Sequence, residues 1–216
     1  MSEVCRIIDE PADIDRRLAE LGLVQSWLVA AVLSGDAGAS TSTALHPPND
    51  AGFRRWADSV AELRMQSLPH GWRHSNELNY CTIFNQQTRT AVAIMAGDEL
   101  TGSRLGAPRS RYPKGVLTRM RINININNGQ GSLFPSLKTP NEIVEQDCTT
   151  WTLVQCAAED GIHAELSLPR RQNERGHVVD YAERILLPAI DPRGGALAGT
   201  SNDPGQPDVD FDVHVR

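Results

Sequence analysis

Seven positively charged side chains are gathered in one stretch of the sequence that has no acidic residue. No Asp or Glu occurs from residue 100 to residue 141, and this stretch contains Arg104, Arg109, Arg111, Lys114, Arg119, Arg121 and Lys138. The chain as a whole has a net charge of -6, so the stretch is opposite in sign to the rest of the protein. Because guanidinium and ammonium groups neutralise phosphates and carboxylates, the pattern predicts contact with an anionic partner, either a nucleic acid or an acidic protein.

The first part of the basic stretch is typical of a loop and the second part of a strand. Residues 97–115 hold four glycines and two prolines without an apolar period, and loops of this length are often functional. In "RMRINININN", apolar and polar residues alternate over 119–127, which predicts a half-buried strand with a basic, amide-rich outer face. The cations expected to contact the partner are Arg104, Arg109, Arg111, Lys114, Arg119 and Arg121.

The acidic end of the chain offers a second interpretation of these charges. In "DVDFDVHVR", Asp208, Asp210, Asp212 and His214 alternate with apolar residues and would share one face of a strand. That face would either pair with the basic strand, at a few tenths to about 1 kcal/mol per pair, or compete with an anionic ligand. Asp210, Asp212 and His214 are also weak candidates for a metal site, against the simpler interpretation of a solvated acidic edge strand.

An enzymatic alternative is a metal-dependent phosphodiester hydrolase. Its carboxylates and imidazole would come from Asp98, Glu99, His163 and Glu165, or from the 210–214 strand. The sequence contains neither HExxH nor a G-x-S-x-G element, and "GDELTG" lacks the Gly-Lys-Ser/Thr of a phosphate loop. These patterns favour a non-enzymatic protein, and no cofactor is predicted. A structural subunit of a larger complex is a third possibility, and the sequence does not indicate an oligomeric state.

Helical patterns fill the first third of the chain. Pro11 and the acids after it predict the start of a helix that ends near Gly22. The apolar residues 23–34 predict a second, buried helix that ends at Gly35. Residues 50–69 predict a longer third helix. The short spacing of the first two helices suits a helix-turn-helix, but the second helix is too apolar to lie in a DNA groove and contains no basic residue, so it is interpreted as part of the core.

Strand patterns follow. Residues 80–84 and 90–95 predict two strands joined by a polar turn, and Glu159-Asp160-Gly161 predicts the turn of a hairpin. Residues 177–190 predict a strand or a short helix. The expected fold class is α+β, an N-terminal helical part packed on a mainly antiparallel sheet. We expect a helical part over 1–70, a sheet part over 71–190, and a Gly/Pro/Asp-rich tail over 191–216.

Composition bounds the class of protein. The chain is 40% hydrophobic and 22% charged, as expected of a globular protein. Its first twenty residues are acidic rather than basic and apolar, and no run approaches the roughly twenty apolar residues of a membrane span. The four cysteines form no CxxC pair. These features predict a cytoplasmic protein with reduced thiols and no membrane partner.

Several segments carry a resemblance to a known group. "AGFRRWADSVAELRMQSLPHGWRHSNELNY", "AIMAGDELTG", "ELSLP" and "ERILLP" together resemble uncharacterised bacterial proteins of genomic islands and prophage-like regions. The resemblance spans most of the chain. It implies an accessory protein of a mobile or defence-related locus, and it implies no activity and no site residues.

Overall fold

A computed structural model describes residues 4–129 and 145–193. The elements follow the chain as β1 (Arg6–Ile8), α1 (Pro11–Glu20), α2 (Gln25–Ser40), α3 (Asp50–Ser67), η1 (Leu68–His70), β2 (Arg73–Ser75), η2 (Glu77–Asn79), β3 (Thr82–Asn85), β4 (Thr90–Ala96), α4 (Val116–Gly129), η4 (Glu145–Asp147), β5 (Thr149–Ala158), β6 (Gly161–Gln172) and β7 (Val178–Leu186).

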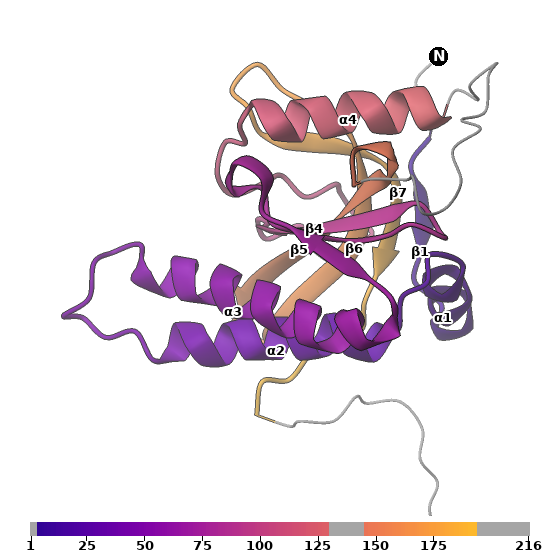
Figure 1. Cartoon of the computed structure of the whole chain (residues 1–216). Helices are drawn as coiled ribbons and strands as arrows, with labels where there is room; N and C mark the ends of the chain where they lie inside the picture. The colour runs from indigo at the N-terminus through magenta and orange to yellow at the C-terminus, as the bar shows by residue number, and fades with distance from the viewer. Residues whose placement is uncertain (1–3, 130–144, 194–216) are drawn as a thin grey trace, which may run out of the picture.

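The seven strands form one mixed sheet in the order β1-β7-β6-β5-β4-β3-β2 (Figure 1). β1 runs parallel to β7 and β4 runs parallel to β5, while the other four pairings are antiparallel. The α+β class expected from the sequence is therefore confirmed, with a sheet that is mixed rather than purely antiparallel. The division into three parts stays a prediction, and the predicted C-terminal strand lies outside the described residues.

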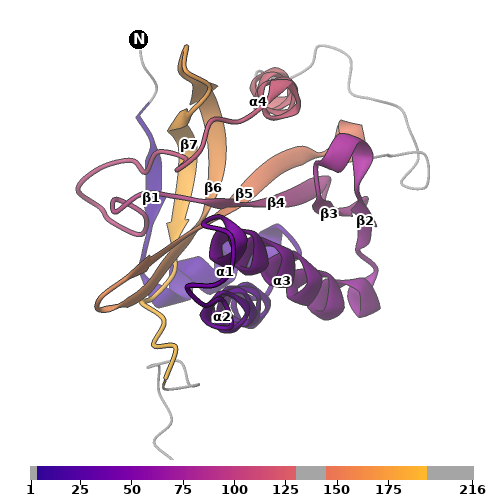
Figure 2. The same ribbon diagram turned by 90° about the vertical axis from the view of Figure 1, so that its left-hand side faces the viewer.

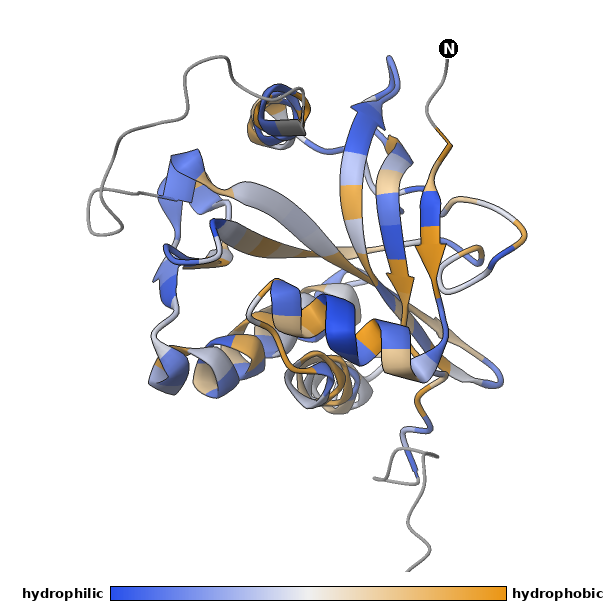
Figure 3. Cartoon of the chain, turned by 90° about the vertical axis from the view of Figure 1, so that its right-hand side faces the viewer, coloured by the Kyte–Doolittle hydropathy of each residue, from blue (hydrophilic) through white to orange (hydrophobic). Residues whose placement is uncertain are grey.

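The sheet is covered on both faces, by α1, α2 and α3 on one side and by α4 on the other (Figure 2). The larger core cluster joins the first three helices to alternate residues of the strands, such as Trp151 and Leu153 of β5. Thr152 lies between Trp151 and Leu153 and therefore faces the opposite side of the sheet. Val154 faces that side too, and it packs with Ile122 of α4. In Figure 3, β7 carries hydrophobic residues at its two ends and mainly hydrophilic residues between them, including the buried Glu183 and Arg184.

Most of the predicted elements are present, and one ends later than expected. α1 begins at Pro11, and the hairpin turns at Glu159-Asp160 between β5 and β6. The second helix does not stop at Gly35 but continues to Ser40. The glycine is retained inside the helix because α2 and α3 approach closely at this point. A Cβ built on Gly35 would overlap the Ser59 hydroxyl and the Arg55 carbonyl oxygen of α3.

This close approach makes a prediction about two helical glycines. Gly35→Ala should lower the free energy of unfolding by about 1–3 kcal/mol, because the added methyl overpacks the α2–α3 contact. Gly52→Ala in α3 is the matched control, since a Cβ there meets nothing within 4 Å. The control should gain about 0.5–1 kcal/mol from helix propensity. Urea denaturation measures both, and equal effects of the two substitutions would contradict the packing described for Gly35.

No single helix in the described parts of the chain is long and apolar enough to cross a membrane. α1 and α2 reach the required length and composition only as a pair, and they are bent by 96° to each other.

Candidate functional site

The basic loop, residues 97–115, is tied along its length to the sheet. Gly97 and Ser110 form a β-bridge, and the Arg111 N–H donates to the Ala96 carbonyl at 2.9 Å. The Ser110 N–H also donates to the Val178 carbonyl of β7 at 3.0 Å. Further along the loop, the Lys114 N–H donates to the Gly176 carbonyl at 2.7 Å. The backbone of the loop therefore has a defined path that fixes the positions from which its arginines emerge.

A buried ion pair underneath the loop supports its first half. Arg184 of β7 and Glu165 of β6 are 1% and 0% exposed, and Arg184 Nη2 lies 2.5 Å from Glu165 Oε2. The same guanidinium donates to the Gly106 carbonyl at 2.7 Å and to the Ser103 carbonyl at 3.0 Å. Glu165 Oε2 in turn accepts the Gly102 N–H at 2.8 Å. One buried pair thus satisfies backbone groups of the loop that would otherwise be desolvated without partners.

The segment after the loop is a helix, so the strand predicted over 119–127 is wrong. In α4 the buried residues are Arg121, Ile122 and Asn125, which share one face at helical spacing. Asn125 Nδ2 donates to the Thr150 carbonyl of β5 at 2.9 Å, and Asn125 Oδ1 accepts the Thr150 N–H at 2.8 Å. These tertiary hydrogen bonds favour the helix over the strand that the local alternation predicts.

Arg121 is a structural residue rather than part of an outer face. Its guanidinium and the carboxylate of Glu145 are each 7% exposed, with 2.5 Å between Nη2 and Oε1. The Arg121 Nη1 also donates to the Glu145 backbone carbonyl at 3.1 Å, and the Thr82 hydroxyl donates to Oε1 at 2.8 Å. The expected outward position of Arg121 is therefore wrong. Its guanidinium points inward and pairs with Glu145, and this pair anchors α4 to η4 and β3.

The other five predicted cations are placed differently from one another. Arg104 forms an ion pair with Asp9 at 2.7 Å. Arg119 lies on the exposed side of α4, where its Nε donates to Gln172 Oε1 at 3.4 Å. Arg109 and Arg111 are exposed on the loop. Within the described residues, Arg109, Arg111 and Arg119 have no carboxylate within 4.0 Å. They remain candidates for contact with a partner.

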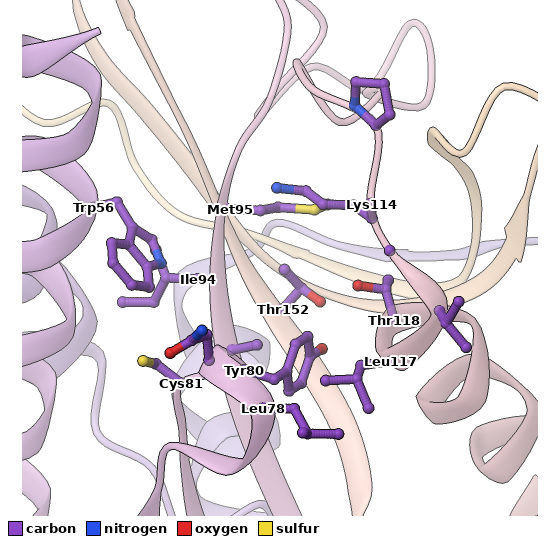
Figure 4. A pocket seen from close by; sticks show the side chains of 15 residues that line it. Trp56, Leu78, Tyr80, Cys81, Ile94, Met95, Lys114, Leu117, Thr118 and Thr152 are labelled. Carbon is purple, nitrogen blue, oxygen red and sulfur yellow. The ribbon is translucent and has the colours of Figure 1, made fainter.

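Lys114 lines a pocket of about 460 Å³ (Figure 4). The pocket lies beside β4, where the pairing of β3 with β4 ends at Thr82 and Ala93. Burial lowers the pKa of the Lys114 ammonium from its ordinary value. On the opposite wall, burial raises the pKa of the Tyr80 hydroxyl to about 12, with a smaller opposing effect of Arg121.

The structure also adds a cation that the sequence did not single out. The turn between β6 and β7 packs on the end of the basic loop, because the His177 ring Nδ1 lies 2.6 Å from the Ser110 carbonyl. Arg175 in this turn is exposed, and no carboxylate among the described residues lies within 4.0 Å of it. In the sequence, Arg175 stands only in a turn-forming "NERG", and no neighbouring residue indicates that this turn lies beside residues 97–115.

The residues proposed for a hydrolase are not gathered at one metal site. Glu165 is paired with Arg184, and the His163 Nε2 lies 2.9 Å from Asp160 Oδ1. Asp98 Oδ1 accepts the Leu100 N–H at the start of the loop, and Glu99 is exposed beside it. In the described ranges no group of three His, Cys, Asp or Glu side chains is arranged to hold a metal ion. Asp210, Asp212 and His214 lie outside these ranges.

Comparison with known proteins shows one partial similarity. The chain is 38% identical over 52 residues to the mouse protein SERAC1. These 52 residues are 24% of this chain and 8% of SERAC1. No protein-family model matches the chain, and no solved structure matches it.

Proposed function

We propose that the protein is a non-enzymatic binding or regulatory protein that contacts an anionic partner through the basic loop and the exposed side of α4. Nucleic acid is the first partner to test. The contacts would be made by Arg109, Arg111 and Arg119, with Arg175 beside them. A role as an accessory protein of a mobile or defence-related locus stays part of this proposal.

One observation carries the proposal: positive charge remains exposed on a fixed backbone after the internal ion pairs are counted. Arg104 is paired with Asp9 and Arg121 with Glu145. The other described cations of the acid-free stretch have no such partner, and the loop that presents three of them is hydrogen-bonded to the sheet. A preorganised cationic surface binds phosphates at a lower cost in conformational entropy than a chain that must first be ordered.

The exposed side of α4 adds groups that suit a nucleic acid. Arg119, Asn123 and Asn127 are exposed and spaced four residues apart, so they form one row along the helix. Arginine can contact phosphate oxygens, and the amides can hydrogen-bond to phosphate, sugar or base edges. Tyr112, which is 59% exposed, offers a ring on which an unpaired base can stack.

The test is fluorescence anisotropy of labelled single- and double-stranded oligonucleotides at low salt. Replacing Arg109, Arg111 and Arg119 together by Gln should weaken binding by about 10- to 100-fold, because the phosphate contacts are lost. The matched control replaces Arg16, Arg73 and Arg193 by Gln. These three arginines are also exposed, so the net charge changes equally.

Equal losses in the two triple variants would contradict the proposal, since they would trace binding to net charge alone. Absence of any oligonucleotide binding by the wild type would reject nucleic acid as the partner. An acidic protein would then be the remaining anionic class for the same three arginines.

A further inference from the structure

The pocket beside Lys114 is built from segments that are far apart in the sequence. One wall comes from α3 and from the connection between β2 and β3, and the other from the end of the basic loop and the first turn of α4 (Figure 4). β4 and β5 form the floor. At about 460 Å³ the pocket falls within the range of small-molecule sites, which is about 300–1,000 Å³.

Its lining is mainly apolar. Trp56, Leu78, Ile94, Met95, Val116 and Leu117 supply most of the side-chain surface. Leu78 and Val116 are 74% and 72% exposed, so apolar surface is left uncovered at the rim. A ligand with an apolar body would remove this surface from water, and such burial contributes about 25 cal/mol per Å².

Lys114 is the single charged residue among those that line the pocket. In Figure 4 its side chain points from the loop toward the pocket that it shares with Met95. No described residue forms an ion pair or a side-chain hydrogen bond with the Lys114 ammonium. The chain uses lysine only at positions 114 and 138 among its 21 Lys and Arg residues. A compact, unpaired ammonium therefore stands at a site that is otherwise neutral.

We propose that this pocket binds a small amphipathic anion, a carboxylate with an aliphatic tail. Its carboxylate would pair with the Lys114 ammonium, and the tail would lie against Met95 and Leu117. The ligand would then supply the counter-charge that Lys114 lacks within the described fold, in surroundings where an ion pair is stronger than in water.

Neutral polar groups around Lys114 can complete the recognition of a carboxylate. The hydroxyls of Tyr80, Thr118 and Thr152 are labelled on the same side of β4 as the lysine in Figure 4. With its pKa raised to about 12, the Tyr80 hydroxyl stays protonated at neutral pH and can donate a hydrogen bond. A charged acceptor gains more from such donors than a neutral one, which favours a carboxylate over an alcohol.

Calorimetric titration with octanoate and with octanol tests the proposal directly. Octanoate should bind the wild type at least about tenfold more tightly than octanol, because only octanoate forms the ion pair. Lys114→Met should bring the two affinities to within about threefold of each other. Val116→Glu, at an exposed helix start where an acid is tolerated, should weaken octanoate by about tenfold and octanol by less, because octanol loses only the apolar contact with Val116.

Arg73→Gln is the control for loss of one positive charge, because Arg73 is exposed on β2 and does not line the pocket. It should leave both affinities unchanged. Equal affinity of the wild type for octanoate and octanol, or no binding of octanoate, would overturn the proposal. This outcome is separate from oligonucleotide binding, which depends on Arg109, Arg111 and Arg119.

A second readout follows the lysine itself. Reductive methylation with ¹³C-formaldehyde labels the two lysines and the terminal amine and keeps their charges. Lys114→Met assigns the Lys114 resonance by its loss. Its NMR titration should give a pKa below the ordinary value, and saturating octanoate should raise that pKa because the carboxylate stabilises the charged form. An unchanged pKa in the presence of octanoate would contradict the ion pair.

Discussion

Replacing Arg121 by Glu is expected to lower the free energy of unfolding by about 3–5 kcal/mol or to prevent folding altogether. The substitution removes the guanidinium that pairs with Glu145 and places a second carboxylate against it in a site that is 7% exposed. It also removes the donor to the Glu145 backbone carbonyl. Urea denaturation followed by far-UV circular dichroism measures the change.

Arg119→Glu is the matched control, since it makes the same change of charge two residues earlier on the same helix. Arg119 is exposed, and its contact with Gln172 is a long 3.4 Å. Its effect on stability should stay within about 0.5 kcal/mol, as is usual at exposed positions. If both variants are equally stable, α4 is not anchored through Arg121, and the assignment of this residue to the fold fails.

Replacing Arg184 by Met should have an effect of similar size, about 3–5 kcal/mol, through the basic loop. The substitution leaves Glu165 charged and 0% exposed, and it removes the donors to the Ser103 and Gly106 carbonyls. Hydrogen exchange should show lower protection of the Gly102 N–H, because its acceptor Glu165 has lost the guanidinium that holds it in place.

The double substitution Arg184→Met/Glu165→Leu separates the two parts of this effect. Removing both charges avoids an unpaired buried carboxylate, so most of the lost stability should return. The loop carbonyls remain without their donor, so oligonucleotide binding should stay weaker than in the wild type. Full stability together with wild-type binding in the double variant would show that the pair does not position the loop.

The predictions from sequence succeeded where local pattern and tertiary packing agree. Pro11 with the acids after it marks the start of α1, and the apolar run from residue 90 to 95 is β4. They failed where a distant residue decides the outcome. Gly35 is a helix terminator by propensity, but in α2 it lies directly against Ser59 of α3.

The same reason explains the error over α4. "RMRINININN" has the period of a strand, and no residue within it signals a helix. Its helical state is supported by Glu145 and Thr150, which follow Asn125 by twenty or more residues. Only contacts between residues this far apart in the sequence show that Arg121 points inward and Arg119 outward.

The candidate site was therefore only partly predictable. The reversal of charge between residues 100 and 141 is visible in the sequence, and so is the loop over 97–115. The sequence does not show which of these cations are neutralised, because the partners of Arg104 and Arg121 are far away in the chain, at positions 9 and 145. The pocket around Lys114 was missed for a related reason, because the residues that line it come from five separate segments of the chain.

The salt dependence of oligonucleotide binding tests the proposed function most directly. For the wild type, log K should fall linearly with log[salt], with a slope of about -0.9 for each phosphate contact on duplex DNA. The variant with Arg109, Arg111 and Arg119 replaced by Gln should have a slope shallower by about 2 to 3, while the Arg16, Arg73 and Arg193 control keeps the wild-type slope. Identical slopes for all three proteins would contradict the assignment of the anionic partner to the basic loop and α4.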